Sequence, residues 1–280
     1  MEKRYFYSIL FALSLTFILP GWSTADPAFP VSGTDAQSLG RGGTVIASPP
    51  GKSSALGNPA TLTPDGFFAL GAEYLRTRGA DKGSWVASIV DTSSSVRGAL
   101  NYYSDPQFAG FEKNLWGVAF AQTLTPYLTL GESFHMGEYA PETDSKQDLS
   151  AADLGLLLTL GGHVSVGYVA RNLYRSDSDL LERTTGFGLA LNLPWTLLVT
   201  VDYEEVPFED GEEDKRAGIE FSPFTWLDGR FGYQDLAGGT IYYTAGITYS
   251  DVNGSLDAAV LYNKDTKKTD RIIIGFTIGM

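Results

Sequence analysis

The 280-residue sequence contains no cysteine and only two histidines. Without cysteine, the chain can form neither a disulfide framework nor a thiolate metal site. The histidines, His135 and His163, lie on separate segments and neither has a second histidine at i, i+4 spacing. We therefore expect no metal site and interpret both histidines as polar residues near strand ends.

Positive charge is scarce as well. Lysine and arginine total 20 against 33 aspartates and glutamates, which gives a net charge of −13. Nucleic-acid binding needs a basic surface, so we expect no nucleic-acid partner. Charged residues make up only 19% of the chain, whereas aromatic residues make up 13% and glycines number 32. Few charges combined with many glycines and aromatics are typical of a lipid-facing β-sheet with a tight interior.

Motifs for cofactors and catalysis are incomplete. Gly51-Lys52-Ser53 resembles the end of a phosphate-binding loop, but the glycine required five residues earlier is replaced by Ile46. Glu204 and Glu205 are adjacent on a predicted strand, so their side chains point to opposite faces and cannot share a site. No nucleophile elbow is present. We expect no cofactor and no enzymatic activity.

Long apolar runs are confined to the N-terminus. Basic residues precede a nearly continuous apolar run from Tyr5 to Leu19, and small residues follow at 23–25. This order predicts a secretory signal peptide over residues 1–25. A run of about fifteen apolar residues is short for a membrane-spanning helix. We therefore expect a protein that leaves the cytoplasm.

The following segment, residues 26–64, is rich in glycine and proline. These residues exclude long helices and strands, yet Leu39, Ile46 and Leu56 provide apolar anchors. A compact irregular segment needs a surrounding surface to satisfy its backbone groups. The sequence therefore predicts a plug that is enclosed by the rest of the chain.

Residues 65–280 contain recurring segments of about ten residues in which apolar and polar positions alternate. In one of them Val96, Leu100 and Tyr102 share a face opposite Arg97 and Asn101. Counting the weaker segments gives about fourteen strands. We predict an all-β protein: a transmembrane antiparallel β-barrel around an N-terminal plug.

Connection lengths support this prediction. Short turns are expected near residues 92, 126, 162, 194, 223 and 253, and longer polar connections at 76–84, 105–114, 137–150, 174–183, 206–214 and 264–269. Short periplasmic turns that alternate with longer external loops are typical of outer-membrane barrels. A soluble β-sandwich also alternates, but its outward face should be polar. Two segments fit the barrel less well, because Glu132 lies on an apolar face and the Trp85 segment is apolar on both sides.

The polar faces supply candidates for a narrow polar lumen. Two readings remain open: oppositely charged side chains pair across the interior and close it, or they line a conducting path. The lumen candidates are Arg97, Asp153, Arg171, Asp202, Glu220, Asp228, Arg230 and Asp257, with Glu204 and Arg216 beside them.

One motif in the predicted plug resembles a known family. The motif consists of Ser38-Leu39-Gly40-Arg41-Gly42-Gly43, followed by Ser54-Ala55-Leu56-Gly57-Asn58-Pro59-Ala60. It is similar to the N-terminal signature of the FadL-type outer-membrane superfamily, which includes long-chain fatty-acid transporters and PorV/PorQ-like proteins of type IX secretion. The resemblance implies a fourteen-strand barrel in the bacterial outer membrane, with Gly40, Arg41, Gly42, Gly43, Asn58, Pro59 and Ala60 in a plug within the lumen. This chain departs from the fatty-acid transporters in its shorter, acidic loops, such as residues 209–214.

The resemblance implies two alternative functions. The first is passage of a small hydrophobic molecule through the plugged lumen; the alternative is an outer-membrane scaffold or secretion accessory without transport activity. Expected partners are outer-membrane lipid and either a hydrophobic small molecule or a secretion protein. Within the plug we expect Asn58 to hydrogen-bond nearby backbone and Arg41 to contact Asp153 or Asp257.

Overall fold

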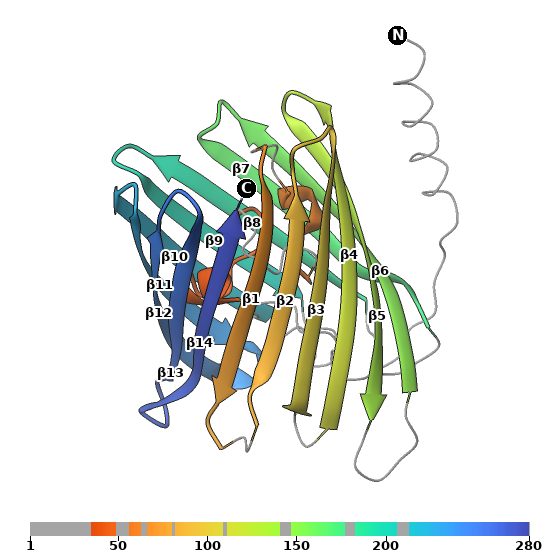
Figure 1. Ribbon diagram of the computed structural model, residues 1–280, viewed down its shortest axis with the longest axis vertical. Helices are drawn as coiled ribbons and strands as arrows, with labels where there is room; N and C mark the ends of the chain where they lie inside the picture. The colour runs from red at the N-terminus through yellow and green to blue at the C-terminus, as the bar shows by residue number, and fades with distance from the viewer. Residues whose placement is uncertain are drawn as a thin grey trace.

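A computed structural model describes residues 35–48, 56–62, 66–79, 82–108, 111–140, 147–176, 183–205 and 213–279. The predicted signal peptide and parts of the predicted plug lie outside these ranges. The described chain forms a closed antiparallel barrel in which consecutive strands pair and β1 closes against β14 (Figure 1). The predicted all-β barrel of about fourteen strands is confirmed.

The strands of the barrel are β1 (Phe68–Thr77), β2 (Ser84–Asp91), β3 (Val96–Phe108), β4 (Phe111–Thr125), β5 (Leu128–Ala140), β6 (Gln147–Leu160), β7 (Val164–Arg175), β8 (Thr184–Leu193), β9 (Leu197–Glu205), β10 (Glu213–Phe224), β11 (Leu227–Leu236), β12 (Thr240–Ser250), β13 (Gly254–Asn263) and β14 (Lys268–Gly279). The short helices are α2 (Ala36–Gly40), η3 (Pro59–Thr61) and η4 (Ala237–Gly239). None of the helices in the described ranges is long and apolar enough to cross a membrane.

The two ends of the barrel differ. Short turns join β2 to β3, β4 to β5, β6 to β7, β8 to β9, β10 to β11 and β12 to β13, and we call this the turn end. The C-terminal end of β14 lies at this end as well (Figure 1). We call the opposite end the loop end.

Two expected loops are largely strand. β3 and β4 stay paired from the turn end to Asp105 opposite Lys113, and β5 and β6 to Tyr139 opposite Gln147. The connections predicted at 105–114 and 137–150 are therefore wrong in extent. Polar composition alone does not distinguish a loop from a paired strand that extends beyond the membrane-facing apolar surface, because such a strand can be polar on both faces.

The barrel exposes its apolar faces and buries its polar ones. Trp116 and Ile274 are 50% and 60% exposed, whereas Arg97 in the interior is 1% exposed. Every backbone N–H and C=O of a closed sheet can pair with a neighbouring strand, so this arrangement suits a lipid surrounding. Glu132 does lie on the outward face, opposite Phe120 and Leu154, as its position in the sequence indicated.

Aromatic side chains gather near both ends of the outward surface. The exposed aromatics toward the loop end include Tyr74, Trp85, Tyr203, Tyr243 and Tyr262, and those toward the turn end include Tyr127, Trp195, Phe224, Trp226 and Tyr249. Two such bands match the interfacial girdles of membrane barrels.

Candidate functional site

The candidate site is the barrel interior, where residues 35–48 and 56–62 lie against the inner wall; we call these residues the inner segment. Helix α2 contacts β11, β12, β13 and β14, whereas η3 contacts β4, β5 and β6. Both elements are coloured red to brown in Figure 1 and lie within the ring of strands. The inner segment thus runs along most of the inner circumference.

Local sequence explains both short helices. Asp35 caps α2, since its Oδ1 accepts a hydrogen bond from the Ser38 amide at 2.8 Å. Asn58 caps η3 by accepting from the Ala60 amide at 3.0 Å, and Pro59 takes the first helical position. Between the two helices, Gly42 and Gly43 have φ values of 72° and 73°, which favour glycine. The glycine pair allows the chain to leave α2 and follow the wall.

Glycines in the wall let the inner segment approach the strands closely. At each of these positions a Cβ atom would overlap or crowd the inner segment: Gly131 against Ala60, Gly155 against Asn58, Gly167 and Gly188 against residues 46–47, Gly218 and Gly232 against residues 41–42, and Gly246 against Gly40. The composition alone predicts only a tight interior. The structure shows that these wall glycines provide the space in which the inner segment lies.

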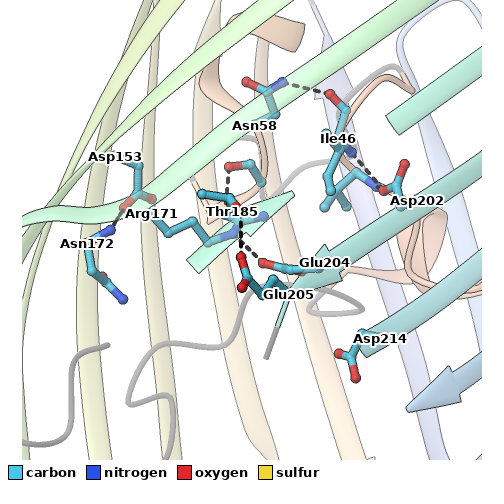
Figure 2. A network of polar contacts seen from close by, with 12 residues as sticks. Ile46, Asn58, Asp153, Arg171, Asn172, Thr185, Asp202, Glu204, Glu205 and Asp214 are labelled. Carbon is cyan, nitrogen blue, oxygen red and sulfur yellow. Dashed lines mark hydrogen bonds and ion pairs between the residues drawn. The ribbon is translucent and has the colours of Figure 1, made fainter. Parts of the chain in front are cut away.

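Asp202 holds the middle of the inner segment. Its Oδ2 accepts hydrogen bonds from the amides of Val45 at 2.6 Å and Ile46 at 2.9 Å, and its carboxylate faces Ile46 in Figure 2. Asn58 donates to the Ile46 carbonyl at 2.7 Å. Asn58 thus connects the two described parts of the inner segment, and its side chain bonds to nearby backbone as expected.

A chain of ion pairs lies beside Asn58 on the wall. Arg171 donates to Glu204 at 2.7 Å, and Glu204 accepts from Arg216 at 2.9 Å. These three side chains are no more than 6% exposed. Arg171 also donates to the Gly57 carbonyl at 3.1 Å, so the charged chain is hydrogen-bonded to the inner segment. Buried charges of this kind need such partners to offset the loss of water.

A second charged cluster lies near the turn end of β10–β13. Arg41 donates to Glu220 at 3.0 Å, and Arg230 donates to the same carboxylate at 2.5 Å. The contact of Arg41 that the structure establishes is with Glu220, and its expected contact with Asp153 or Asp257 stays a prediction. Asp257 accepts from Gln37 of the inner segment at 3.2 Å.

Asp153 has a different role, at an irregularity of the wall. The pairing of β6 with β7 shifts between Ala152 and Leu154, and Asn172 of β7 has a φ of 53°. The Asn172 amide donates to Asp153 Oδ1 at 2.8 Å (Figure 2). The carboxylate therefore satisfies a backbone group that the bulge removes from the strand ladder.

The other oxygen of Asp153 completes a Ser–His–Asp cluster that does not have triad geometry. Asp153 Oδ2 lies 2.8 Å from His135 Nε2, and Ser133 Oγ lies 3.1 Å from the same nitrogen. A catalytic triad needs the serine and the carboxylate on different ring nitrogens. Within the described chain, no group of three or more His, Asp or Glu residues could hold a metal ion.

The interior is not uniformly polar. A buried apolar cluster faces the lumen on the loop-end side, and we call it the apolar cluster. Its members are Ala36, Leu39, Leu56, Leu75, Val86, Tyr103, Leu115, Leu149, Ala151, Ala259, Leu261 and Ile273. Several of its wall residues pair directly across the sheet: Val86 with Tyr103, Tyr103 with Leu115, and Leu75 with Ile273. The interior therefore has an apolar part in addition to the polar lumen that the sequence predicts.

This cluster also explains why β2, the strand that contains Trp85, is apolar on both sides. Trp85 faces outward at 54% exposure, while Val86 faces the apolar cluster at 1%. Toward the turn end, Val90 joins a second buried group with Leu62 of the inner segment. Both faces of β2 are therefore apolar because both contact apolar surroundings.

A pocket of about 480 Å³ lies at the loop end, next to the apolar cluster, and we call it the vestibule. Two of its lining residues connect it to the cluster: Leu261 is a member of the cluster, and Tyr242 packs against it. The rim is polar: Thr77, Arg78, Asp270 and Arg271 contribute to it. A volume of this size is within the range of small-molecule sites. A separate depression of about 610 Å³ lies on the outward surface near Tyr102, Trp116 and Met136.

The eight lumen candidates from the sequence all face the interior. Six of them are buried: Arg97, Asp153, Arg171, Asp202, Arg230 and Asp257. Sequence reasoning missed Glu73, which is 2% exposed and accepts from the Ala36 amide at 3.1 Å, and it missed the apolar cluster. Alternation places Glu73 on the inward face, but its signal was weak because its neighbours Gly71 and Leu75 are apolar.

The sequence matches no protein-family model and no curated protein. The fold is similar to that of several solved barrels. They include the toluene transporter TodX of Pseudomonas putida (TM-score 0.67, 14% identity, 90% of this chain and 98% of that chain covered), the toluene transporter TbuX of Ralstonia pickettii (0.69, 13%, 89% and 98%) and the monoaromatic hydrocarbon channel CymD (0.65, 15%, 90% and 98%). This likeness in fold agrees with the barrel architecture that the resemblance of residues 38–60 implied.

Proposed function

We propose that this chain is an outer-membrane channel that passes small apolar molecules, with the inner segment as its plug. The observation that carries the proposal is the apolar cluster, which extends from the vestibule to Leu39 and Leu56 of the inner segment. A water-filled porin has a polar interior, and a scaffold needs no apolar lining inside its wall. The solved barrels of similar fold are described as toluene transporters and a monoaromatic hydrocarbon channel, which supports the same class of cargo.

The proposed path has two parts. An apolar molecule enters the vestibule and is buried against the apolar cluster, which is favourable because it loses contact with water. It then meets the inner segment, which is held by Asp202, Arg171 and Glu220. A plug of this kind must move or part before passage, so the proposal makes the inner segment a gate. It assigns the chain no catalytic step.

Uptake of radiolabelled toluene by whole cells tests the proposal, since an intact lipopolysaccharide leaflet hinders apolar molecules. Cells that contain the barrel should take up toluene faster than cells without it, and neither should gain uptake of a labelled disaccharide. Deletion of residues 33–60 should admit both compounds, because it removes the plug. If the folded wild-type barrel gives no more toluene uptake than the empty cells, transport is excluded and the scaffold alternative takes its place.

A further inference from the structure

The vestibule has a charged lining that passage of a pure hydrocarbon does not need. Three of its lining residues are ionisable: Arg78, Asp270 and Arg271. Two positive charges against one negative charge leave this lining with one positive charge in excess. The whole chain has a net charge of −13, so the positive balance is local to the vestibule. A lining of this kind is complementary to a ligand with a single negative charge.

The ion pair at the rim of the vestibule is weak enough to be exchanged for a ligand. Arg78 Nη1 lies 3.9 Å from Asp270 Oδ1, and the two side chains are 47% and 27% exposed. An exposed pair at this separation contributes little stability. The backbone holds the rim independently of the pair, since the Arg78 amide donates to the Asp270 carbonyl at 2.7 Å. The Arg78 guanidinium can therefore bind an anion while the local backbone stays in place.

The second guanidinium adjoins the apolar part of the lining. Arg271 of β14 pairs across the sheet with Leu261 on one side and Thr77 on the other, and all three line the vestibule. Leu261 belongs to the apolar cluster, and the Tyr242 ring packs against that cluster. Two guanidinium groups and a small apolar surface with one aromatic ring thus line the same pocket.

We propose that the vestibule is a binding site for small aromatic monocarboxylates, such as benzoate. The carboxylate accepts hydrogen bonds from Arg78 and Arg271, because a planar guanidinium matches a carboxylate in geometry. The ring is buried against Tyr242 and Leu261, an apolar surface that covers one ring rather than a long alkyl chain. Asp270 opposes a second negative charge on the ligand. The site goes beyond the proposed function, since binding in the vestibule needs no movement of the inner segment.

Equilibrium binding to the purified barrel tests this site separately from transport. The probes are 4-fluorobenzoate, fluorobenzene and 4-fluorobenzylamine, which share one ring and are negative, neutral and positive at neutral pH. Each is titrated into the full barrel in a neutral detergent and followed by ¹⁹F NMR, with protein-free micelles as the blank. We expect 4-fluorobenzoate to bind about tenfold more tightly than fluorobenzene, the effect of a charge-assisted hydrogen bond. 4-Fluorobenzylamine should bind more weakly than the benzoate, because the lining has an excess of positive charge.

Variants of the lining change its charge in both directions. The Arg78→Gln/Arg271→Gln double variant should bring the affinities for 4-fluorobenzoate and fluorobenzene within about twofold, because no cation of the lining remains. Asp270→Asn removes the competing carboxylate and should tighten binding of the benzoate about threefold, with no change for fluorobenzene. Loss of a merely structural ion pair would not tighten binding of one probe alone.

A matched control and a milder variant complete the set. Arg76 of β1 is exposed and is not among the described residues that line the vestibule, so Arg76→Gln should keep the preference for the benzoate. Arg78 follows the last residue of β1, and Arg78→Gln alone should lower the preference about threefold even if the double variant fails to fold. Heat-modifiable gel mobility shows whether each variant is folded.

The outcomes separate this inference from the proposed function. Equal binding of 4-fluorobenzoate and fluorobenzene, tighter binding of the amine, or a full preference for the benzoate in folded Arg78→Gln would each overturn the inference. Weaker binding of the benzoate to folded Asp270→Asn, or loss of the preference in Arg76→Gln, would overturn it as well. If none of the three probes binds the wild-type barrel, the vestibule is not a binding site, whereas passage of apolar molecules is still decided by the uptake of toluene.

Discussion

At the scale of single residues, the inner segment fits against the wall because glycines occupy the wall positions that it contacts. A Cβ atom at Gly155 would overlap the Asn58 side chain, whereas a Cβ at the outward-facing Gly98 would come no closer than 3.9 Å to any neighbour. Gly155→Ala should therefore lower the free energy of unfolding by about 1–3 kcal/mol through overpacking. Gly98→Ala should change it by less than about 0.5 kcal/mol. Urea unfolding followed by tryptophan fluorescence compares the two, and equal midpoints would contradict the close contact.

The buried ion pairs allow a second comparison between neighbours. Glu204 bonds to both Arg171 and Arg216 inside the barrel, whereas Glu205 is exposed and bonds to Thr185. Glu204→Gln leaves two buried guanidinium groups with weaker partners and should cost about 3–5 kcal/mol of unfolding free energy. Glu205→Gln should cost less than about 1 kcal/mol. The same urea titration measures both, and a loss at Glu205 as large as that at Glu204 would argue against the buried network.

Single residues also show where sequence reasoning reaches its limit. Alternation places Arg171, Asp202 and Glu220 on inward faces, because the side-chain period of a strand is two. It does not reveal that Asp202 bonds to the Val45 amide, or that Arg41 pairs with Glu220. These contacts join residues more than 150 positions apart in sequence, and they depend on how the inner segment lies along the wall.

At the scale of elements, the strands and their order were predictable, but their ends and irregularities were not. The bulge of β7 at Asn172 has no sequence signal beyond a residue that tolerates positive φ. The inward apolar positions Val86 and Leu115 were equally hard to assign. In a strand that is apolar on both faces, periodicity cannot distinguish lipid from an apolar lumen.

The closing strand β14 gives a prediction at this scale. Ile274 faces outward at 60% exposure, in the middle of a strand paired on both sides with β1 and β13. Ile274→Arg should lower barrel stability by about 2–4 kcal/mol in liposomes, the cost of a charge near the bilayer midplane. Val252→Arg is the control, since Val252 is 97% exposed in a turn and should tolerate the change. Equal folded yields in a gel-mobility assay would mean that Ile274 does not face lipid.

At the scale of the whole molecule, the barrel places three layers in series from loop end to turn end. The vestibule leads to the apolar cluster, and the rest of the inner segment follows. Ala60 and Leu62 of that segment belong to smaller apolar groups with wall residues on the turn-end side. The charged anchors are concentrated where the inner segment meets the wall, so they serve to hold the segment. This layering is what makes the inner segment the central element of the proposed path.

Locking the inner segment to the wall tests that claim most directly. Thr44 and Thr200 are both buried, with their Oγ1 atoms 2.8 Å apart, and the natural chain has no cysteine to interfere. In a Thr44→Cys/Thr200→Cys variant, the oxidised disulfide should reduce toluene uptake by whole cells to the level of cells without the barrel. Reduction should restore it, and each single variant should behave like the wild type in both conditions. Undiminished uptake by a fully oxidised, folded double variant would contradict a gate that must move.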